Sequence, residues 1–481
     1  MGRYAFNEFD HLECPSIERV KAVLARHGCH VGLVKELPKN ANDKNQVYIH
    51  SDVTLLNTIF RLSFSERGRS FSESKRGSRP GRRIPQALFH RFGWVDTDGR
   101  LVNVKACKAI VYTQYPEARL SGFVTDDGRM PRSLSIEYTR RDDVLRRFMV
   151  LGATHSGDAV AMMVVNPSVA FIDQFRGLES YHDSRVCKAI SVGARNESGE
   201  AKLKALFRRN VKNRHLLGCR ADKHLNKIPF NGTQVHGYTL EHALEIAPNS
   251  DKKGDIFGIE LKCLTRQKVT LFTPEADGGL YARSYPEFMM TYGYLKGEDY
   301  RFTGLHRAYC KNPKTGLTLK IVWTAESDLC GTRSGSDATW TRQYNPEVPI
   351  RKQLNNLQVV LEDDAGVVAA SWSLERLLNC WGVKHQQVVY VRAVKSENPD
   401  TETRRKGFKW VIKYEPEVLW CSETSSKHLF DAIHHGIIFL DPAPKYNPIE
   451  SKRNKRRTQW RVNNIEKAAQ HLYARTQKKN L

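Results

Sequence analysis

Two carboxylates and a lysine fall within eight positions of one another. They are Asp255, Glu260 and Lys262, in the run Gly-Asp-Ile-Phe-Gly-Ile-Glu-Leu-Lys at residues 254–262. If 257–261 form a strand, Ile259 and Leu261 point into a core, whereas Glu260 and Lys262 share the opposite face. Two carboxylates can hold a hard divalent cation. A neighbouring ammonium can stabilise charge on a phosphate or help to deprotonate an attacking water.

The flanking residues decide between this chemistry and a simpler alternative, a surface strand whose Glu260 and Lys262 make cross-strand ion pairs. Upstream, Thr239 is a candidate N-cap of a short helix with an apolar stripe of Leu240, Ala243 and Leu244. Glu241 lies on another face of this helix. Helix and strand together form one compact unit in which a third carboxylate accompanies the first two.

The run from Gly237 to Gly279 resembles the MvaI/BcnI family of restriction endonucleases and, more distantly, the mismatch-repair enzyme MutH, both in the PD-(D/E)XK nuclease superfamily. Four segments carry the resemblance. They are Tyr-Thr-Leu-Glu at 238–241, Gly-Asp at 254–255, Gly-Ile-Glu-Leu-Lys at 258–262 and Thr-Leu-Phe-Thr-Pro-Glu at 270–275. Gly254 stands where the superfamily has proline. Because that proline only shapes the turn before the strand, the substitution leaves the metal site intact.

The resemblance extends more loosely to the C-terminus, and the length of 481 residues indicates two domains. Residues 205–481 are expected to form an α/β nuclease domain, a mixed central sheet flanked by helices. Residues 1–190 form an unrecognised α+β or mostly β domain that could bind DNA, and 191–204 form a linker rich in Gly, Asn, Glu and Ser.

The resemblance implies a type II restriction endonuclease that hydrolyses phosphodiester bonds of double-stranded DNA with Mg²⁺, for which Mn²⁺ can substitute. Asp255, Glu260 and the Leu261 carbonyl would hold the metal, and Lys262 would position or activate water. Glu241 would reach a second metal or its waters. The enzyme would act as a monomer on a short GC-rich site such as CCWGG or CCSGG, beside a cognate DNA methyltransferase.

The composition agrees with a polyanionic partner. The chain has 76 Lys and Arg against 52 Asp and Glu, a formal charge of +24, which favours DNA binding through counterion release. The run from Lys452 to Arg461 holds six cations, no acid and one aromatic residue, Trp460. Where the family often has arginine shortly after the residue matching Asp441, this chain has Ala443. The residues expected to contact DNA are Arg266, Asp441, Lys445, Lys455, Arg457 and Arg461.

Local patterns predict elements in the N-terminal half. Residues 17–27 have helical periodicity, and 102–112, 120–124, 148–152 and 159–165 resemble strands. The segment 63–83 has seven Lys and Arg against two Glu. It is expected to be a mobile, exposed loop that either serves solubility or orders on DNA as a phosphate-binding arm.

In the C-terminal half, strands are expected at 317–323, 357–361, 388–394 and 408–414, and helices at 372–379, 426–435 and 464–474. The adjacent His434 and His435 suggest a metal site at first sight. Neighbouring residues on a helix diverge by about 100°, so a capping or surface role near the helix end is preferred.

The remaining features concern the compartment and the alternatives. The ten cysteines form no CxxC pair, which is typical of reduced thiols in a cytoplasmic protein. An apolar leader and a run of 18 apolar residues are both missing, so membrane insertion is not expected. A MutH-like nickase would use the same site but cut one strand. A non-catalytic DNA-binding protein would gain nothing from a complete carboxylate and lysine set, and an RNA-processing enzyme fits the charge but not the motif.

Overall fold

A computed structural model describes most of the chain. The described residues are 7–38, 47–50, 53–67, 84–112, 117–182, 184, 186–192, 199–246, 256–265, 267–324, 342–354 and 356–481. They divide into two compact units. The first comprises the described residues up to 192 together with 348–354, and the second comprises the described residues from 199 onward without that stretch.

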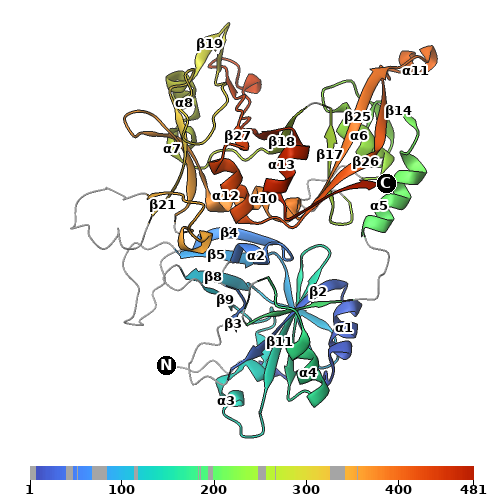
Figure 1. The fold of residues 1–481 in the computed structure, drawn as a ribbon, viewed down its shortest axis with the longest axis vertical. Coiled ribbons are helices and arrows are strands. Elements are labelled where there is room, and N and C mark those ends of the chain that lie inside the picture. Colours follow the sequence, from blue (N-terminus) through green and yellow to red (C-terminus); the bar gives the residue numbers. More distant parts are fainter. Residues whose placement is uncertain are drawn as a thin grey trace. The chain divides into compact units, whose positions relative to one another are not determined.

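The first unit contains two mixed or antiparallel sheets and a short strand pair (Figure 1). The six-stranded sheet follows the order β13 (Lys188–Ser191), β2 (Cys29–Leu37), β11 (Arg147–Thr154), β12 (Ala159–Val165), β6 (Phe92–Val95) and β7 (Leu101–Asn103). The five-stranded sheet follows the order β3 (Val47–Tyr48), β9 (Glu117–Ser121), β8 (Lys108–Tyr112), β5 (Ile84–Phe89) and β4 (Leu62–Arg67). Strands β1 (Asn7–Phe9) and β10 (Arg129–Pro131) pair in parallel.

Helices α1 (Ile17–Arg26) and α4 (Val169–Gly177) bury their apolar residues against the six-stranded sheet. Ser16 caps α1 by accepting from the Arg19 N–H at 3.1 Å, as its position before an apolar-periodic run favours. Val20 and Leu24 of α1 join Phe171 of α4 in one core. Two shorter helices, α2 (Val53–Leu56) and α3 (Ile136–Thr139), complete the unit. The helix expected at 17–27 is confirmed.

Three expectations for this unit were wrong in detail. The single strand expected at 102–112 is two strands in different sheets, because Lys105 between them gives its N–H to Val124. The strand expected at 120–124 ends at Ser121, since Gly122 has φ +83° and turns the backbone. Ser63 and the four residues after it lie in β4 rather than in a loop, and the rest of that expected loop, 68–83, falls outside the described residues.

The second unit is built on a mixed five-stranded sheet. Its strands are β14 (His215–Leu217), β26 (Trp410–Ser422), β25 (Gln387–Glu397) and β17 (Glu260–Leu264), in that order, with β30 (Arg475–Asn480) also on β26. Helices α5 (Gly199–Asn210) and α6 (Val235–Ala243) contribute Leu203, Phe207 and Leu240 to the core on one face of this sheet. The α/β nuclease-type fold expected for this half is confirmed.

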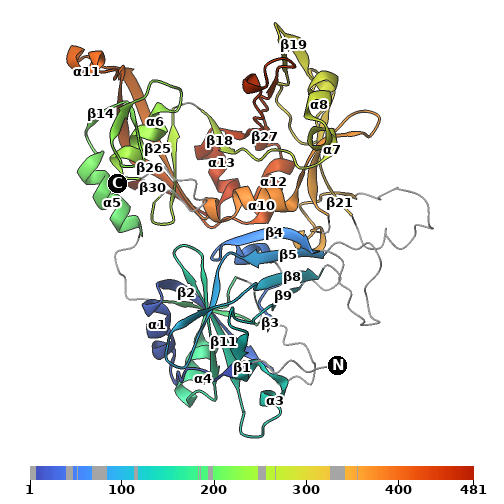
Figure 2. The same ribbon diagram turned by 180° about the vertical axis from the view of Figure 1, so that it is seen from behind.

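Smaller sheets extend the second unit (Figure 2). They are β18 (Lys268–Phe272) with β29 (Trp460–Asn463) and β27 (Ile438–Leu440); β22 (Arg342–Gln343), β21 (Thr318–Trp323), β23 (Gln358–Glu362) and β24 (Val368–Ser373); β19 (Tyr294–Lys296), β20 (Asp299–Arg301) and β28 (Lys445–Tyr446); and β15 (Cys219–Ala221) with β16 (Lys227–Pro229). The helices are α7 (Gly279–Arg283), α8 (Tyr285–Tyr292), α10 (Leu374–Trp381), α11 (Thr401–Arg405), α12 (Ser426–His434) and α13 (Ile465–Leu472).

The expected elements of this half are found with shifted ends. Trp372 belongs to β24 rather than to a helix, because Ser373 caps α10 by accepting from the Arg376 N–H at 3.2 Å. His435 is the exposed C-cap of α12, and His434 Nδ1 lies 3.2 Å from Tyr309 Oη. The capping and surface role expected for the histidine pair is confirmed. No helix in the described part of the chain is long and apolar enough to cross a membrane.

Candidate active site

Strand β17 presents Glu260 and Lys262 on one face of the five-stranded sheet. It runs parallel to β25, with Glu260 beside Val388 and Lys262 beside Tyr390. Ile259 is fully buried in the core under α5 and α6, on the other face. The separation of the acidic and basic residues from the apolar ones is therefore confirmed, and it follows from the alternation of side chains along a strand.

The turn before β17 explains why the strand begins later than expected. Ile256 and Ile259 exchange backbone hydrogen bonds of 3.1 and 2.8 Å, and Phe257 and Gly258 between them have φ of +51° and +78°. Two consecutive residues with positive φ are the signature of a tight hairpin turn. The chain thus reverses immediately before Glu260, and the expected strand start at Phe257 was wrong.

Glu260 and Lys262 form a poorly solvated, incompletely satisfied pair. Lys262 Nζ donates to Glu260 Oε1 at 3.2 Å, and the two side chains are 17% and 10% exposed. Glu260 Oε2 is buried and has no hydrogen-bond partner among the described residues. A buried carboxylate oxygen without a partner is costly, and native proteins rarely retain one without a reason. A divalent cation is a group that such an oxygen could ligate.

Two further ligands, Asp255 and Glu241, were predicted to join this pair. Asp255, one residue before the turn, lies outside the described residues, as does Arg266. Glu241 is half-buried on α6. Within the described part of the chain, no three acidic, His or Cys side chains converge as a metal site. The ligand roles of Asp255 and Glu241 remain predictions.

Thr239 is not the N-cap of α6, which begins at Val235. Its hydroxyl instead bonds to the backbone of Cys219, accepting from the N–H at 3.0 Å and donating to the carbonyl at 3.3 Å. The hydroxyl therefore ties α6 to β15. A local pattern could not reveal this contact between residues 20 positions apart.

A buried network of hydrogen bonds between side chains lies beside Glu260 and Lys262. His385 Nδ1 is 2.9 Å from Tyr473 Oη, which is 3.0 Å from Tyr390 Oη. His385 also bonds to the Leu271 carbonyl, so the second ring nitrogen carries the proton and Nδ1 accepts from Tyr473. The Tyr473 and Tyr390 hydroxyls share the second hydrogen bond. Sequence reasoning missed these residues, which come from three separate elements.

The surroundings of this hydrogen-bonded network keep His385 neutral. Burial is the main cause that holds the pKa of His385 well below its usual value, and the nearby Lys262 ammonium lowers that pKa further. The pKa of Tyr390 is raised, mainly by burial, with Glu260 contributing. Its position beside Lys262 on the neighbouring strand places Tyr390 next to the pair. The pair therefore sits on a neutral, fully hydrogen-bonded support.

A second charged cluster lies on the sheet β18–β29–β27. Asp441 Oδ2 accepts from Arg461 Nη1 at 2.8 Å and from Lys268 Nζ at 3.1 Å. Arg461 also donates through Nε to Thr270 Oγ1 at 2.9 Å. Asp441 and Arg461, both predicted to contact DNA, are thus brought together, and Lys268 was missed. Lys268 was missed because it lies 173 residues from Asp441 in the sequence.

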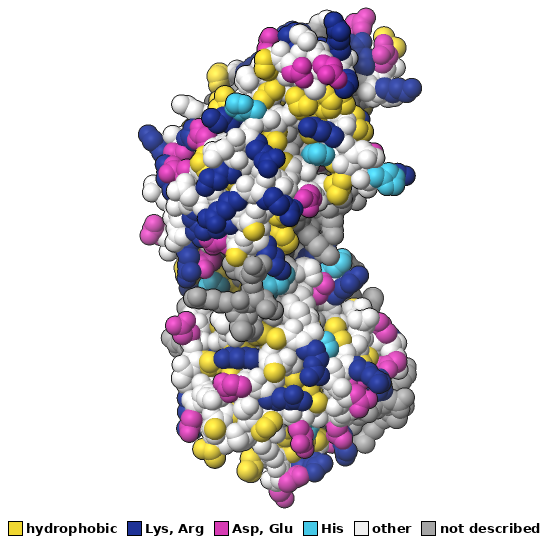
Figure 3. All heavy atoms as spheres, turned by 90° about the vertical axis from the view of Figure 1, so that its right-hand side faces the viewer, with side chains coloured by type: hydrophobic (Ala, Val, Ile, Leu, Met, Phe, Trp, Pro, Cys, Tyr) yellow, Lys and Arg dark blue, Asp and Glu magenta, His cyan; other side chains and the backbone are white. Residues whose placement is uncertain are grey.

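The basic run 452–461 is divided between internal and exposed charges. Arg453 bridges Glu298 and Asp299 at 2.8 and 3.1 Å, and Lys445 pairs with Asp299 at 2.6 Å. Lys455 and Arg457 are exposed and make no ion pair with a described residue. Figure 3 shows Lys and Arg side chains gathered over the C-terminal unit.

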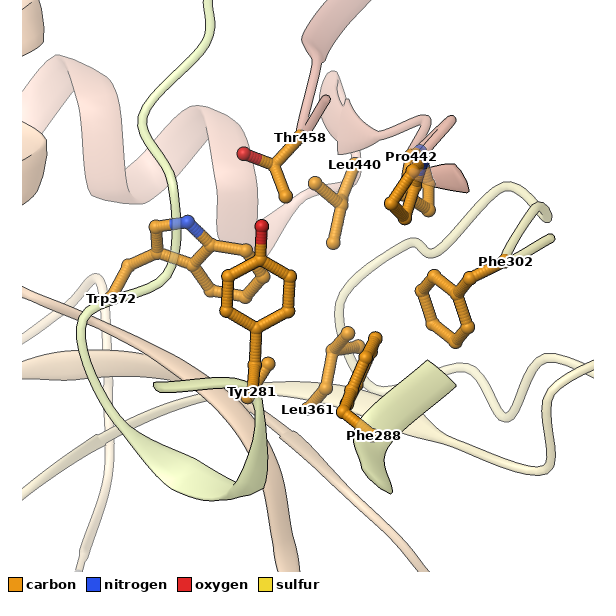
Figure 4. Close-up of a pocket in the computed structure, with 10 residues that line it drawn as sticks. Tyr281, Phe288, Phe302, Leu361, Trp372, Leu440, Pro442 and Thr458 are labelled. Carbon is orange, nitrogen blue, oxygen red and sulfur yellow. The ribbon is translucent and has the colours of Figure 1, made fainter. Parts of the chain in front are cut away.

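The second unit also contains a surface groove and a small internal cavity. An open groove of about 300 Å³ beside Phe439 and Asn463 is lined by Arg307, Lys467 and His471. A second cavity, of about 10 Å³, lies among Tyr281, Phe288, Trp372 and other apolar side chains (Figure 4). Its volume is at the limit for a single water, so this second hollow belongs to the packed core rather than to a ligand site.

Comparisons with known proteins match the chain to one family and to two solved structures. The sequence model of the MvaI/BcnI restriction endonuclease family matches residues 210–473. A structure of the restriction endonuclease MvaI with cognate DNA matches with 15% identity and a TM-score of 0.38, covering 60% of this chain and 99% of that one. MvaI without DNA matches with 13% identity and a TM-score of 0.30 over the same shares of the two chains. No curated protein matches.

The family match spans more than half of the chain and includes both charged clusters. It defines a type II restriction endonuclease, an enzyme that binds DNA and hydrolyses its phosphodiester bonds. The chain belongs to the MvaI/BcnI restriction endonuclease family.

Proposed function

We propose that the chain cuts double-stranded DNA by Mg²⁺-dependent hydrolysis at Glu260 and Lys262. The observation that carries this proposal is the buried Glu260 Oε2, which has no hydrogen-bond partner among the described residues while Oε1 accepts from Lys262. A strand that served only the core would not need this arrangement.

Glu260, Asp255 and the Leu261 carbonyl would hold the metal, for which Mn²⁺ could substitute, with Glu241 reaching a second metal or its waters. When bound, the ion lowers the pKa of a water and offsets charge on the phosphate. The reversal of the chain at Ile256 and Ile259 supports the assignment of Asp255, which directly precedes that turn. Oxygen ligands are those that Mg²⁺ prefers.

Lys262 would act on the phosphate and the attacking water. Its ammonium is held 3.2 Å from Glu260 Oε1 in a pocket that leaves the side chain 17% exposed. In such a poorly solvated site, a fixed positive charge stabilises the negative charge that develops on the phosphate oxygens. The neutral His385 beneath it adds no competing charge.

DNA contacts fall into two groups. Asp441 and Arg461, with Lys268, would read base edges, because an Asp-anchored Arg presents a fixed fork to a purine and a carboxylate can accept from cytosine. Lys455 and Arg457, and Arg266 beyond the described residues, would contact phosphates. Lys445 is bound to Asp299 and would act by positioning this region.

The target would be a short GC-rich site such as CCWGG or CCSGG, cut by a monomer whose host carries the cognate methyltransferase. In the N-terminal unit, residues 68–83 connect the paired strands β4 and β5 and include six Lys and Arg. They would add a second DNA contact. Replacing these six residues by Gln should weaken DNA binding and reduce its salt dependence, without changing cleavage at saturating DNA.

The test of the proposed function is incubation of the purified protein with a plasmid of known sequence and Mg²⁺, followed by mapping of the ends. Discrete ends at one repeated short sequence are expected, and EDTA should abolish them. A protein that binds the plasmid but leaves it intact with both Mg²⁺ and Mn²⁺ would overturn the proposal.

A further inference from the structure

Strands β25 and β26 form an arm that reaches beyond the rest of their sheet. Strand β17 pairs with β25 only as far as Arg392, whereas β25 continues to Glu397. Over this extension β25 pairs with β26, and β14 adds only Val411 to Lys413 on the far side. Figures 1 and 2 both show α11 at the end of this ribbon. We call residues 393–411 the arm.

The tip of the arm is held in a defined shape although it buries little apolar surface. Asn398 is 2% exposed, and its Nδ2 donates to Thr403 Oγ1 and to the Phe408 carbonyl, each at 2.8 Å. Asp400 caps α11 by accepting from the Glu402 and Thr403 N–H groups. Such ordering costs conformational entropy without a core to offset it, which suggests that the shape serves a contact.

The tip carries an excess of exposed positive charge. Its acids are mostly engaged, since Asp400 caps the helix and Glu402 accepts from Lys406 at 2.6 Å. Arg404 and Arg405 are exposed and make no ion pair with any described residue. Further exposed cations are Lys395 and Lys409 of the arm and Lys227, whose Nζ lies over the Phe408 ring, and the exposed acid Glu397 offsets one of them.

The arm continues the sheet face that carries the catalytic pair. Lys262 lies beside Tyr390, so alternation along β25 places Arg392, Val394 and Ser396 on the face of Glu260 and Lys262. Val394 is 57% exposed, which shows that this face is open along the arm. The seven residue-to-residue steps from Tyr390 to Glu397 span about 23 Å, or roughly seven base pairs of DNA.

We propose that the arm binds the phosphate backbone of DNA flanking the cleaved site, through Arg404 and Arg405. This proposal rests on the proposed function, because it takes the DNA to lie along the face of Glu260 and Lys262. Two adjacent guanidinium groups on a tip of defined shape can contact neighbouring phosphates of one strand, which follow one another about every 3.4 Å along the helix axis. The contact adds affinity and no sequence information.

The test is a salt series of binding to a duplex of about 40 base pairs, in EDTA, with the full chain and its R404A/R405A variant. Each lost phosphate contact lowers the slope of log K against log salt by about 0.9, so the variant should lose about 2. R404K/R405K should restore the slope, because lysine also neutralises a phosphate. Cleavage at saturating DNA should remain unchanged in both variants.

The matched control is R208A/R209A, which removes two adjacent arginines from the last turn of α5. Helix α5 packs on the other face of the sheet, so this variant should keep the slope. Thermal unfolding of each variant checks its folding. If R404A/R405A keeps the slope of the wild type, or loses no more than R208A/R209A, the arm does not bind DNA. Continued cleavage by R404A/R405A would leave the catalytic proposal intact in that case.

Discussion

The two charged clusters of the nuclease unit treat their carboxylates differently. Asp441 directs one oxygen to two cations, Arg461 and Lys268, so its cluster has a surplus of positive charge. Glu260 meets a single cation, Lys262, and its second oxygen is unpartnered among the described residues. A site in which a carboxylate oxygen is left without a partner suits a metal cation. A site with more positive than negative charges suits DNA. The partners of each carboxylate, rather than its presence alone, therefore distinguish the two clusters.

The first prediction tests the catalytic cluster. Lys262→Ala should lower cleavage by several orders of magnitude while DNA binding in EDTA stays within a few-fold, because we propose that this ammonium acts on the transition state. Cleavage is measured under single-turnover conditions. Lys478→Ala, which removes an exposed lysine from strand β30 of the same sheet, serves as the control. Near-normal cleavage by the Lys262 variant, freed of contaminating nuclease, would remove Lys262 from the mechanism.

The second prediction tests the other cluster. Arg461→Ala should weaken binding to the cognate site by about 1–3 kcal/mol, or roughly 5-fold to 150-fold, while binding to unrelated DNA changes much less. Fluorescence anisotropy with the two duplexes measures the difference. Equal losses on both duplexes would reduce Arg461 to a phosphate contact, and the clusters would then differ less than we propose.

The third prediction concerns a buried histidine of the same unit. Burial is the main cause that lowers the pKa of His306 to about 4, below the value of about 6.5 for an unfolded chain. The unfolded state therefore binds the proton first. The contribution of His306 to the free energy of unfolding is therefore fully present above pH 6.5. It decreases as the pH falls toward 4, and about 3 kcal/mol of it is lost at pH 4. Thermal melts of His306→Gln should show a shallower decline than the wild type, and parallel declines would refute the assignment.

The smallest effect is expected for the support beneath the catalytic pair. Tyr473→Phe removes the donor to His385 Nδ1 and should cost about 1–3 kcal/mol of stability. If the network also positions Lys262, single-turnover cleavage should fall several-fold with unchanged DNA affinity. Loss of stability with an unaltered cleavage rate would show that the network serves packing alone.

Sequence patterns predicted what depends on near neighbours. The opposite faces of Ile259 and Glu260 follow from strand alternation, and the helix at 17–26 follows from its apolar periodicity. Patterns failed where a distant partner decided the outcome. Thr239 resembles an N-cap, yet its hydroxyl is taken by Cys219.

The contacts around the charged clusters join residues that are even farther apart in the sequence. The His385 and Tyr473 rings meet across 88 residues, and Lys268 meets Asp441 across 173. No periodicity encodes such pairs, because they depend on how the sheets are assembled. The residue types of the site could therefore be predicted, whereas the supporting network and the pairing of Asp441 could not.

We propose that the unsatisfied carboxylate of Glu260 makes this sheet face catalytic. Glu260→Gln keeps the shape of the side chain and removes its charge. The matched control, Glu417→Gln, changes an exposed carboxylate on β26 of the same sheet. Plasmid cleavage with Mg²⁺ should fall by several orders of magnitude in the first variant and remain normal in the second, with both folded and binding DNA. Near-normal cleavage by the Glu260→Gln protein would contradict the account.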